Sequence, residues 1–332
     1  MTIQQLLKTA PVTTLLLISF IGLFIIQVLT GVDANNPSTE ALLKWGANAL
    51  PLTMDDEPWR LVSSAFLHIG LMHLLFNGFA MYFFGQIAEP MFGSAKFLAL
   101  FLLTAIGGNL LNTQVTWLSI LDGTGQVGLS AGASGGIMGI GAALLIAALF
   151  KISVNGLMLN LRSLLFIMGI NLVYGFAVPG IDNAGHIGGA ITGLVISLAF
   201  AIAYRQRQRM AIATLARQSV VASQGAYRIN EPSPYSSNDQ DTYQIRYVDQ
   251  PTNADISYPT NHDAQLDNSA GINSDMNHNM AHNRVIEQKT PTMPSLVWRL
   301  LPWVVMLLIG IGFVWWWQDI HHQLMQVLKT IE

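Results

Sequence analysis

The chain has 332 residues, of which 52% are hydrophobic and only 11% are charged, and its net charge is −3. It has no cysteine, which excludes disulfides and thiolate metal sites, and it has no basic tract long enough to follow a nucleic-acid backbone. Apolar stretches of the length that crosses a bilayer, about 20 residues, recur along it. The composition therefore predicts a multi-pass membrane protein whose partner is the lipid bilayer and not a nucleic acid.

Seven membrane spans are predicted, at roughly residues 12–31, 64–87, 95–112, 133–150, 162–179, 184–204 and 298–317. The first span has neither the charged flank nor the small-residue cleavage site of a signal peptide, so it counts as a true span. The expected fold class is an all-α polytopic membrane protein. Its six-helix core would occupy residues 1–204, and one further transmembrane helix would lie in residues 296–332.

Two polar regions separate these spans. Residues 32–60 form the first loop, whose apolar side chains, such as Trp45 and Leu50, suit a segment lying at the membrane interface. Residues 205–295 are rich in Asn, Ser, Gln and Asp and lack apolar periodicity, so burial there cannot offset the entropy cost of ordering. We expect this second region to be a mostly disordered cytoplasmic linker.

The distribution of Lys and Arg predicts the orientation, because cytoplasmic loops carry an excess of both. With the N-terminus in the cytoplasm, the basic residues near span ends fall mainly on the cytoplasmic side. Those on that side are Lys8, Lys96, Lys151, Arg162, Arg205, Arg207 and Arg209, and those outside are Lys44, Arg60 and Lys329. The expected location is the plasma (inner) membrane, with the first loop outside.

Strongly polar side chains inside spans are functional candidates by default. His68, His73 and Asn77 lie in the second span, where His73 and Asn77 are four residues apart and project from one helical face. Ser134 opens the fourth span and His186 opens the sixth. A structural role is the alternative for each, since a serine can bond back to its own helix and a histidine can bond between helices.

A zinc site is another interpretation of three histidines. No H-E-x-x-H sequence accompanies them, and no acidic residue stands at ligand spacing. His68 and His73 would also point about 140° apart on a helix. We therefore expect no metal and no other cofactor.

Two serines in the segment GLSAGASGG fit the hydrolase pattern G-x-S-x-G. Ser130 lies in glycine-rich, non-helical chain, whereas Ser134 stands at a helix N-terminus, where free N–H groups and the helix dipole favour a developing oxyanion. Glycines four residues apart follow both Ser134 and His186, and such faces let two helices approach closely. A serine needs an adjacent base to become a nucleophile. Ser134 is therefore the expected nucleophile and His186 its base.

A soluble α/β-hydrolase is excluded by context. In that fold the serine follows a strand, and the acidic member of the triad precedes the histidine in a βα alternation. Here membrane helices are predicted on both sides of Ser134. Asp182, four residues before His186, is expected in a loop outside the membrane, and we do not make it a triad member.

Several ordered motifs over residues 12–205 resemble those of the rhomboid family of intramembrane serine proteases. They are Gly132-Ala133-Ser134-Gly135 at the nucleophile, His186 with Gly189 and Gly193 on the sixth span, His68 with His73 and Asn77 on the second, Trp59-Arg60 in the first loop, and Glu89 between Gly85 and Gly93. The resemblance is specific because the motifs follow one another in a fixed order.

The resemblance implies an intramembrane endopeptidase with a Ser-His dyad, which cuts single-span membrane proteins near the outer face from a water-filled pocket. It implies that Ser134 attacks the scissile carbonyl and that His186 takes the proton and returns it to the leaving amine. The side chains of His73 and Asn77, with the Ser134 N–H, would form the oxyanion hole.

The resemblance also gives His68 a supporting, hydrogen-bonding role and makes Glu89 and Arg60 structural. One departure from the family is Met138, since many members carry an aromatic residue one turn after the nucleophile, packed against the histidine ring. A thioether can also pack against imidazole, so activity is still expected. The seventh span matches the family's six-plus-one arrangement, whereas the long linker before it matches nothing in the family.

Two other function classes stay open. A catalytically inactive rhomboid-like protein would bind membrane proteins without cutting them; such relatives lose the serine or the histidine, and this chain has both. A transporter or channel would show internal repeats in its spans, and none is found. Cleavage of a reporter by the purified protein distinguishes the three classes.

Overall fold

The computed structural model describes residues 3–125, 127–152, 159–177, 182–229 and 296–331. By compactness the chain divides into one unit of Met1–Ala213 with Met293–Glu332 and a second unit of Thr214–Thr292. In the second unit, the described part is the end of a single helix, α10. The rest of the fold described below belongs to the first unit.

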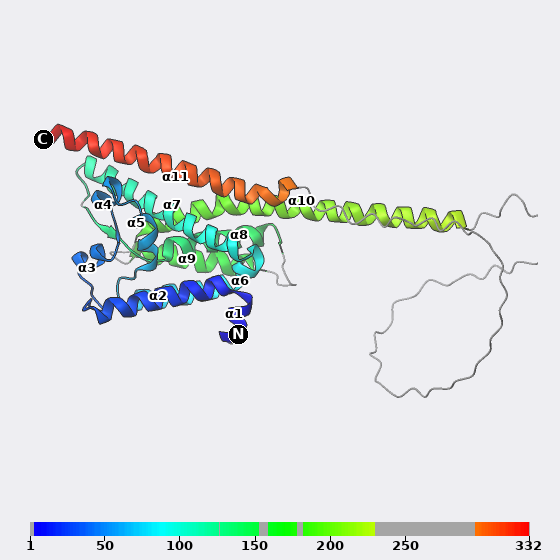
Figure 1. The fold of residues 1–332 in the computed structure, drawn as a ribbon, viewed down its shortest axis with the longest axis horizontal. Helices are drawn as coiled ribbons and strands as arrows, with labels where there is room; N and C mark the ends of the chain where they lie inside the picture. Colours follow the sequence, from blue (N-terminus) through cyan, green and yellow to red (C-terminus); the bar gives the residue numbers. More distant parts are fainter. Residues whose placement is uncertain (1–2, 126, 153–158, 178–181, 230–295, 332) are drawn as a thin grey trace, which may run out of the picture. The chain divides into compact units, whose positions relative to one another are not determined.

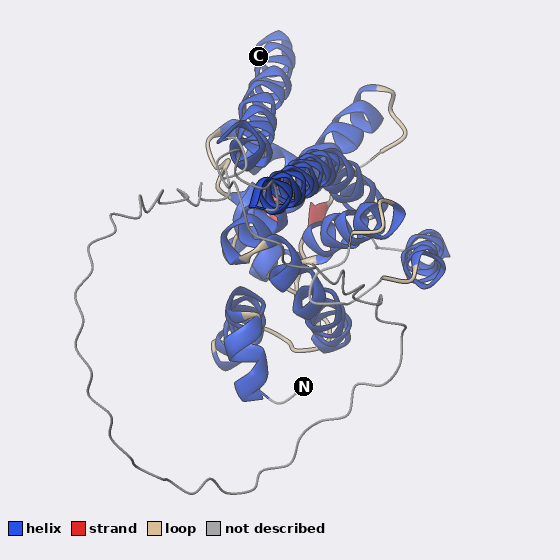
Figure 2. Cartoon of the chain, turned by 90° about the vertical axis from the view of Figure 1, so that its right-hand side faces the viewer, coloured by secondary structure: helices blue, strands red, loops and turns tan. Residues whose placement is uncertain are grey.

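Helices make up nearly all of the described elements (Figures 1 and 2). They are α1 (Ile3–Thr9), α2 (Pro11–Leu29), α3 (Thr39–Lys44), α4 (Leu50–Asp55), α5 (Arg60–Ser63), the 3-10 helix η1 (Ser64–Phe66), α6 (Leu71–Phe92), α7 (Ser94–Leu121), α8 (Ser134–Leu149), α9 (Leu161–Ala177), α10 (Asn183–Ile229) and α11 (Leu296–Ile331). Two short strands, β1 (Asn48–Ala49) and β2 (Leu129–Ser130), pair antiparallel with Asn48 opposite Ser130.

Five of the described helices are long and apolar enough to cross a membrane: α2, α6, α7, α10 and α11. Two shorter apolar helices, α8 and part of α9, accompany them. The prediction of a mostly helical, polytopic membrane protein is therefore confirmed. The count of six spans plus one stays a prediction.

The helix boundaries differ from the predicted ones at several ends. Helices α7 and α11 continue to Leu121 and Ile331, beyond the predicted ends at residues 112 and 317. The second predicted span begins at residue 64, but α6 begins at Leu71. Gly70, directly before it, has a φ of +90°, which a continuous α-helix does not contain. His68 consequently lies outside the helix. Helix α10 is also longer than predicted: it continues to Ile229 through the first part of the predicted linker, where Ala, Arg and Gln favour helix. Residues 230–295, the rest of that linker, lie outside the described residues.

Three helices approach one another backbone to backbone. A Cβ atom at Gly189 of α10 would overlap the carbonyl oxygen of Gly135 in α8, and one at Gly193 would overlap that of Gly139. The predicted close approach of these two glycine faces is thus confirmed. On its other side α10 meets α7, where a Cβ at Gly108 would lie 2.6 Å from the Gly185 carbonyl oxygen.

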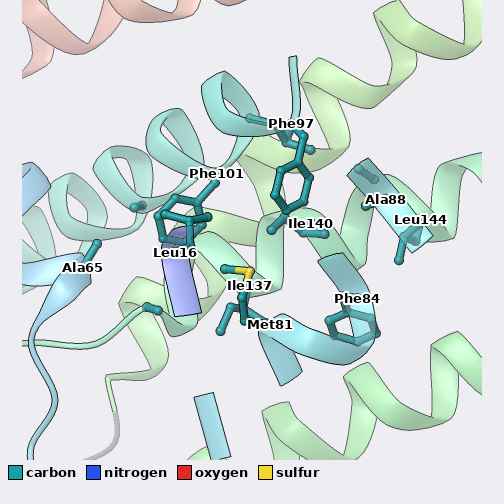
Figure 3. Close-up of a cluster of buried hydrophobic side chains, with 14 of the residues drawn as sticks. Leu16, Ala65, Met81, Phe84, Ala88, Phe97, Phe101, Ile137, Ile140 and Leu144 are labelled. Carbon is teal, nitrogen blue, oxygen red and sulfur yellow. The ribbon is translucent and has the colours of Figure 1, made fainter. Parts of the chain in front are cut away.

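Large apolar side chains pack around this contact (Figure 3). Phe97 and Phe101 of α7, Met81 of α6 and Ile140 of α8 are each completely buried. Glycine also allows the close packing of an aromatic ring on α8, since a Cβ at Gly136 would overlap the Phe101 ring. The helix that begins with Ser134 is therefore held against both α10 and α7.

The N-terminus of α2 is capped by a buried carboxylate. Glu89, only 1% exposed, accepts hydrogen bonds from the Val12 and Thr13 N–H groups at 2.9 and 2.7 Å and from the Thr13 hydroxyl at 2.8 Å. The Ser94 hydroxyl donates a further bond at 2.6 Å. These donors include N–H groups that have no partner within the helix, so Glu89 joins α2 to α6. This is the structural role that the resemblance implies.

The first loop is held by Arg60, which is buried. Its guanidinium donates to the carbonyl oxygens of Leu43 and Ala47 at 2.7 and 3.0 Å and pairs with Glu57. The C-terminal half of α11 docks on the same loop, since the Trp317 indole N–H donates to the Thr53 carbonyl oxygen at 2.8 Å. Polar bonds thus join the first loop to the last helix.

We predict that Gly189→Ala destabilises the protein by about 1–3 kcal/mol, because the added methyl group must push α10 away from α8. Gly22→Ala is the matched control, since Gly22 also lies in a membrane helix but has nothing within 4 Å of an added Cβ. It should be neutral or slightly stabilising because alanine favours helix. Thermal unfolding in detergent measures both; equal stability of the two variants would contradict the contact.

Candidate active site

Ser134 is the first residue of α8 and follows a glycine turn. Gly132 has a φ of +139°, and a Cβ there would lie 2.6 Å from Cε1 of the His73 ring. Its N–H donates to the Ser64 carbonyl oxygen at 2.9 Å. Only glycine meets the backbone and space requirements of this position. The turn therefore presents Ser134 at a helix N-terminus, next to the His73 imidazole.

His186 lies in the first turn of α10, the helix that touches α8 through glycines. Its Nδ1 atom is buried and has no hydrogen-bond partner among the described residues. The residues next to Ser134 and His186 are close, since a Cβ at Gly135 would lie 3.3 Å from the Gly185 carbonyl oxygen, but no hydrogen bond joins Ser134 to His186 in the described chain. Such bonds are often long in a free enzyme and shorten when substrate binds.

A narrow pocket opens beside Ser134. Its polar lining consists of Asn109, Ser130, Ser134 and Asp182, and the remaining lining residues are small: Ala105, Gly108, Gly132, Gly135 and Gly185. Elements far apart in sequence, α7, β2, α8 and the start of α10, thus meet at one serine. Most of the lining residues are small, so little side-chain bulk surrounds the hydroxyl.

The hydrogen bonds of His73 define its tautomer. The Ile69 N–H donates to Nδ1 at 3.1 Å, so the proton of the neutral ring resides on Nε2. The ring lies against Gly132, two residues before Ser134. His73 can therefore donate a hydrogen bond from Nε2 on the side where Ser134 begins its helix.

Asn77 and His68 support His73 in different ways. Asn77 is buried one turn further along α6 and donates from Nδ2 to the His73 carbonyl oxygen at 2.9 Å, which leaves its second N–H for another acceptor. His68 is also buried, and its ring centroid lies 5.4 Å from that of His73 and 5.2 Å from that of Phe20. These ring contacts hold His68 beside His73, and its hydrogen-bonding role stays a prediction.

The structure separates the two candidate serines. Ser130 lies in β2, and its hydroxyl donates to the Asp182 carboxylate at 2.6 Å. Ser134 has no such acidic partner among the described residues and opens α8. The strand pairing and the bond to the carboxylate join Ser130 to the fold, and Ser134 stays the predicted nucleophile.

Sequence reasoning missed two asparagines of α7. The Asn109 amide donates to the Leu61 carbonyl oxygen at 2.8 Å and to the Ser64 hydroxyl at 2.9 Å, which ties α7 to the segment before His68. Asn112 donates to Asp182 at 2.9 Å. An available signal was the spacing of two amide side chains, three residues apart, in an apolar span.

Met138, one turn after Ser134, is buried in α8.

In the described part of the chain, no three His, Asp or Glu side chains gather closely enough to hold a metal ion. The chemistry that the described side chains offer is that of a hydroxyl, a neutral base and hydrogen-bond donors, which is the set that acyl transfer requires.

Comparison with known proteins gives a consistent result. Residues 55–203 match the Rhomboid domain family model. The chain is 37% identical to the rhomboid protease GluP of Bacillus subtilis over 186 residues, which cover 55% of this chain and 34% of GluP. It is 30% identical to the rhomboid protease AarA of Providencia stuartii over 210 residues, which cover 58% of this chain and 74% of AarA.

A plant relative shows a similar match. The chain is 33% identical to the mitochondrial RHOMBOID-like protein 6 of Arabidopsis thaliana over 162 residues, which cover 48% of this chain and 50% of the relative. The chain thus spans about a third of GluP, half of the plant protein and three quarters of AarA.

Proposed function

This chain belongs to the rhomboid family, and on that premise we propose that it is an intramembrane serine endopeptidase that cuts membrane-protein substrates with a Ser134–His186 dyad. The observation that carries the proposal is the glycine contact of α8 with α10, which sets the first residue of one helix beside the first turn of the other. Two relatives named as proteases, GluP and AarA, support the reaction class.

In the proposed reaction, Ser134 Oγ attacks the scissile carbonyl carbon while His186 accepts the hydroxyl proton. When the tetrahedral intermediate collapses, the C–N bond breaks and His186 gives the proton to the leaving amine. A water molecule, deprotonated by His186, then hydrolyses the acyl-enzyme and frees Ser134. Asp182 takes no proton in this scheme, because its carboxylate oxygens already accept bonds from three other groups.

We assign the oxyanion hole to His73, Asn77 and the Ser134 backbone. Nε2 of His73 carries a proton, since Nδ1 accepts one from Ile69, and Asn77 has an N–H that its bond to His73 leaves unused. The Ser134 N–H begins α8 and has no acceptor within the helix. Donors fixed in advance stabilise a developing oxyanion without reorganisation during the reaction.

The proposed setting follows from the basic residues. The N-terminus would lie in the cytoplasm, and the site would open to the outside of the plasma membrane. There it would meet single-span proteins whose peptide bonds lie near the outer end of the span. Because the chain is a multi-pass membrane protein of this family, the substrate reaches the site from the bilayer.

We predict that Ser134→Ala abolishes both proteolysis and labelling by a fluorophosphonate probe, since the nucleophile is lost. Ser130→Ala should keep at least about a tenth of the wild-type kcat, because it loses one hydrogen bond and no reacting group. Both variants of the full chain are assayed in liposomes with a single-span substrate. Loss of activity in Ser130→Ala alone would reverse the assignment.

His73→Ala and Asn77→Ala should each lower kcat by about 10²–10³-fold, or about 3–4 kcal/mol, with an unchanged thermal midpoint. The matched control is His322→Ala, because His322 is an exposed histidine of α11 and should leave kcat unchanged. Wild-type kcat in either site variant would remove that residue from the oxyanion hole.

The cut itself should fall near the outer end of the substrate span, after a small residue. A continuous helix uses its carbonyls in i→i−4 bonds and cannot present them to Ser134, so helix-breaking Gly or Pro residues are needed nearby. A substrate series varies the residue before the cut and replaces the breakers with Leu. Undiminished cleavage of an all-Leu span, or a cut at its cytoplasmic end, would contradict the proposed site and orientation.

A further inference from the structure

Asp182 immediately precedes α10 and caps its first turn. Its Oδ1 accepts the Gly185 N–H at 2.7 Å, and its backbone carbonyl accepts the His186 N–H at 3.1 Å. The negative charge also faces the positive end of the helix dipole. The backbone of His186 is thus bonded directly to the residue that starts its helix.

The same carboxylate reaches two other elements. Oδ2 accepts the Ser130 hydroxyl of β2 at 2.6 Å, and Oδ1 accepts the Asn112 amide of α7 at 2.9 Å. Both bonds are charge-assisted, which makes them about twice as strong as neutral ones. Ser130 ends β2, four residues before Ser134 and directly before the turn that leads into α8. One side chain therefore joins the start of the His186 helix to the approach of Ser134.

Gly185 explains how the carboxylate can fold back over the helix start. A Cβ atom at Gly185 would overlap Asp182 Oδ2, and Gly185 also packs against Gly108 of α7. The sequence Asp182-Asn-Ala-Gly185-His186 thus combines a cap, the space for that cap and the base within one turn. The local sequence and the contact with α7 therefore both favour a carboxylate folded over the first turn of α10.

We infer that Asp182, with Ser130 as its partner, is a positioning residue that fixes His186 relative to Ser134; this inference rests on the proposed function. Asp182 is not a third member of a triad, because its oxygens bond to Gly185, Ser130 and Asn112, while His186 Nδ1 has no partner among the described residues. The hydrogen bonds, and not the charge as such, carry the role.

Substitutions at Asp182 show whether its role depends on its hydrogen bonds or on its negative charge. Asp182→Ala removes the cap and the links to β2 and α7. Asp182→Asn keeps an oxygen for the Gly185 N–H, and its amide can donate to the Ser130 hydroxyl, which can also accept. Ser38→Ala is the control: Ser38 caps α3 in the first loop, where its hydroxyl accepts the Ala41 N–H at 3.2 Å, and it lies outside the proposed machinery.

The full chain and these variants are assayed in liposomes for kcat and KM on a single-span substrate, for the fluorophosphonate labelling rate, and for the thermal midpoint. Asp182→Ala should lower kcat and labelling together by about 10–100-fold with KM unchanged, the size expected for a misplaced catalytic group. Asp182→Asn should restore at least about a third of the wild-type kcat. Ser130→Ala should lose less, and adding it to Asp182→Ala should cost nothing more.

Three results would overturn the inference. One is an Asp182→Ala variant as active as Ser38→Ala, and another is an Asp182→Asn variant as impaired as Asp182→Ala, which would mean that the charge is required. The third is a Ser130→Ala/Asp182→Ala double variant whose losses add. If Asp182→Ala does not fold, the Asp182→Asn variant decides alone, since a kcat well below a third of the wild-type value would overturn the inference. A wild-type chain that neither cleaves nor labels would instead reject the proposed function, and this inference with it.

Discussion

The backbone contact between α8 and α10 is the constraint on which the candidate site depends. A methyl group at Gly189 or Gly193 would overlap a carbonyl oxygen of α8, so nothing larger than hydrogen fits between the two helices. Without a strong hydrophobic drive between helices in lipid, such close packing is the main source of their association. It also brings a short serine side chain near an imidazole on the neighbouring helix, which longer separations would prevent. In this arrangement the interaction that stabilises the fold also assembles the proposed dyad.

The close approach of these two helices could be predicted from the sequence, because its signals are local and repeat along the chain. Glycines four residues apart, a serine at the start of an apolar run and a histidine in a second such run are all visible without tertiary information. The roles of Asn112, Ser130 and Asp182 were not, since they arise only where three segments meet. The start of α6 at Leu71 was also missed, because the positive φ of Gly70 outweighs the apolar pattern before it. The extension of α10 to Ile229 shows helix propensity prevailing where periodicity predicted none.

The buried polar groups fall into two kinds. Glu89, Arg60 and Asp182 each bind several partners, and each joins segments distant in sequence. An unpaired charge in an apolar interior is costly, so such groups persist only with their bonds made. His186 is the opposite case, since its buried Nδ1 has no partner in the described chain. Gln27 and His68 also have buried nitrogens without a partner, so the missing bond alone does not single out His186. The proposal of His186 as the base rests on its place in the first turn of α10, beside the start of α8.

Among the described residues, no carboxylate accepts a hydrogen bond from the His186 ring, so other contacts must orient it. In a Ser-His-Asp triad the carboxylate holds the imidazole directly, and the surrounding backbone can then be less constrained. In the proposed dyad, the position of the imidazole would be set by the position of its helix and not by a bond to its side chain. Glycine contacts fix α10 against α7 and α8, and the Asp182 cap fixes the first turn, in which His186 lies. A carboxylate four residues away would then contribute to catalysis through the backbone, by setting where the helix begins.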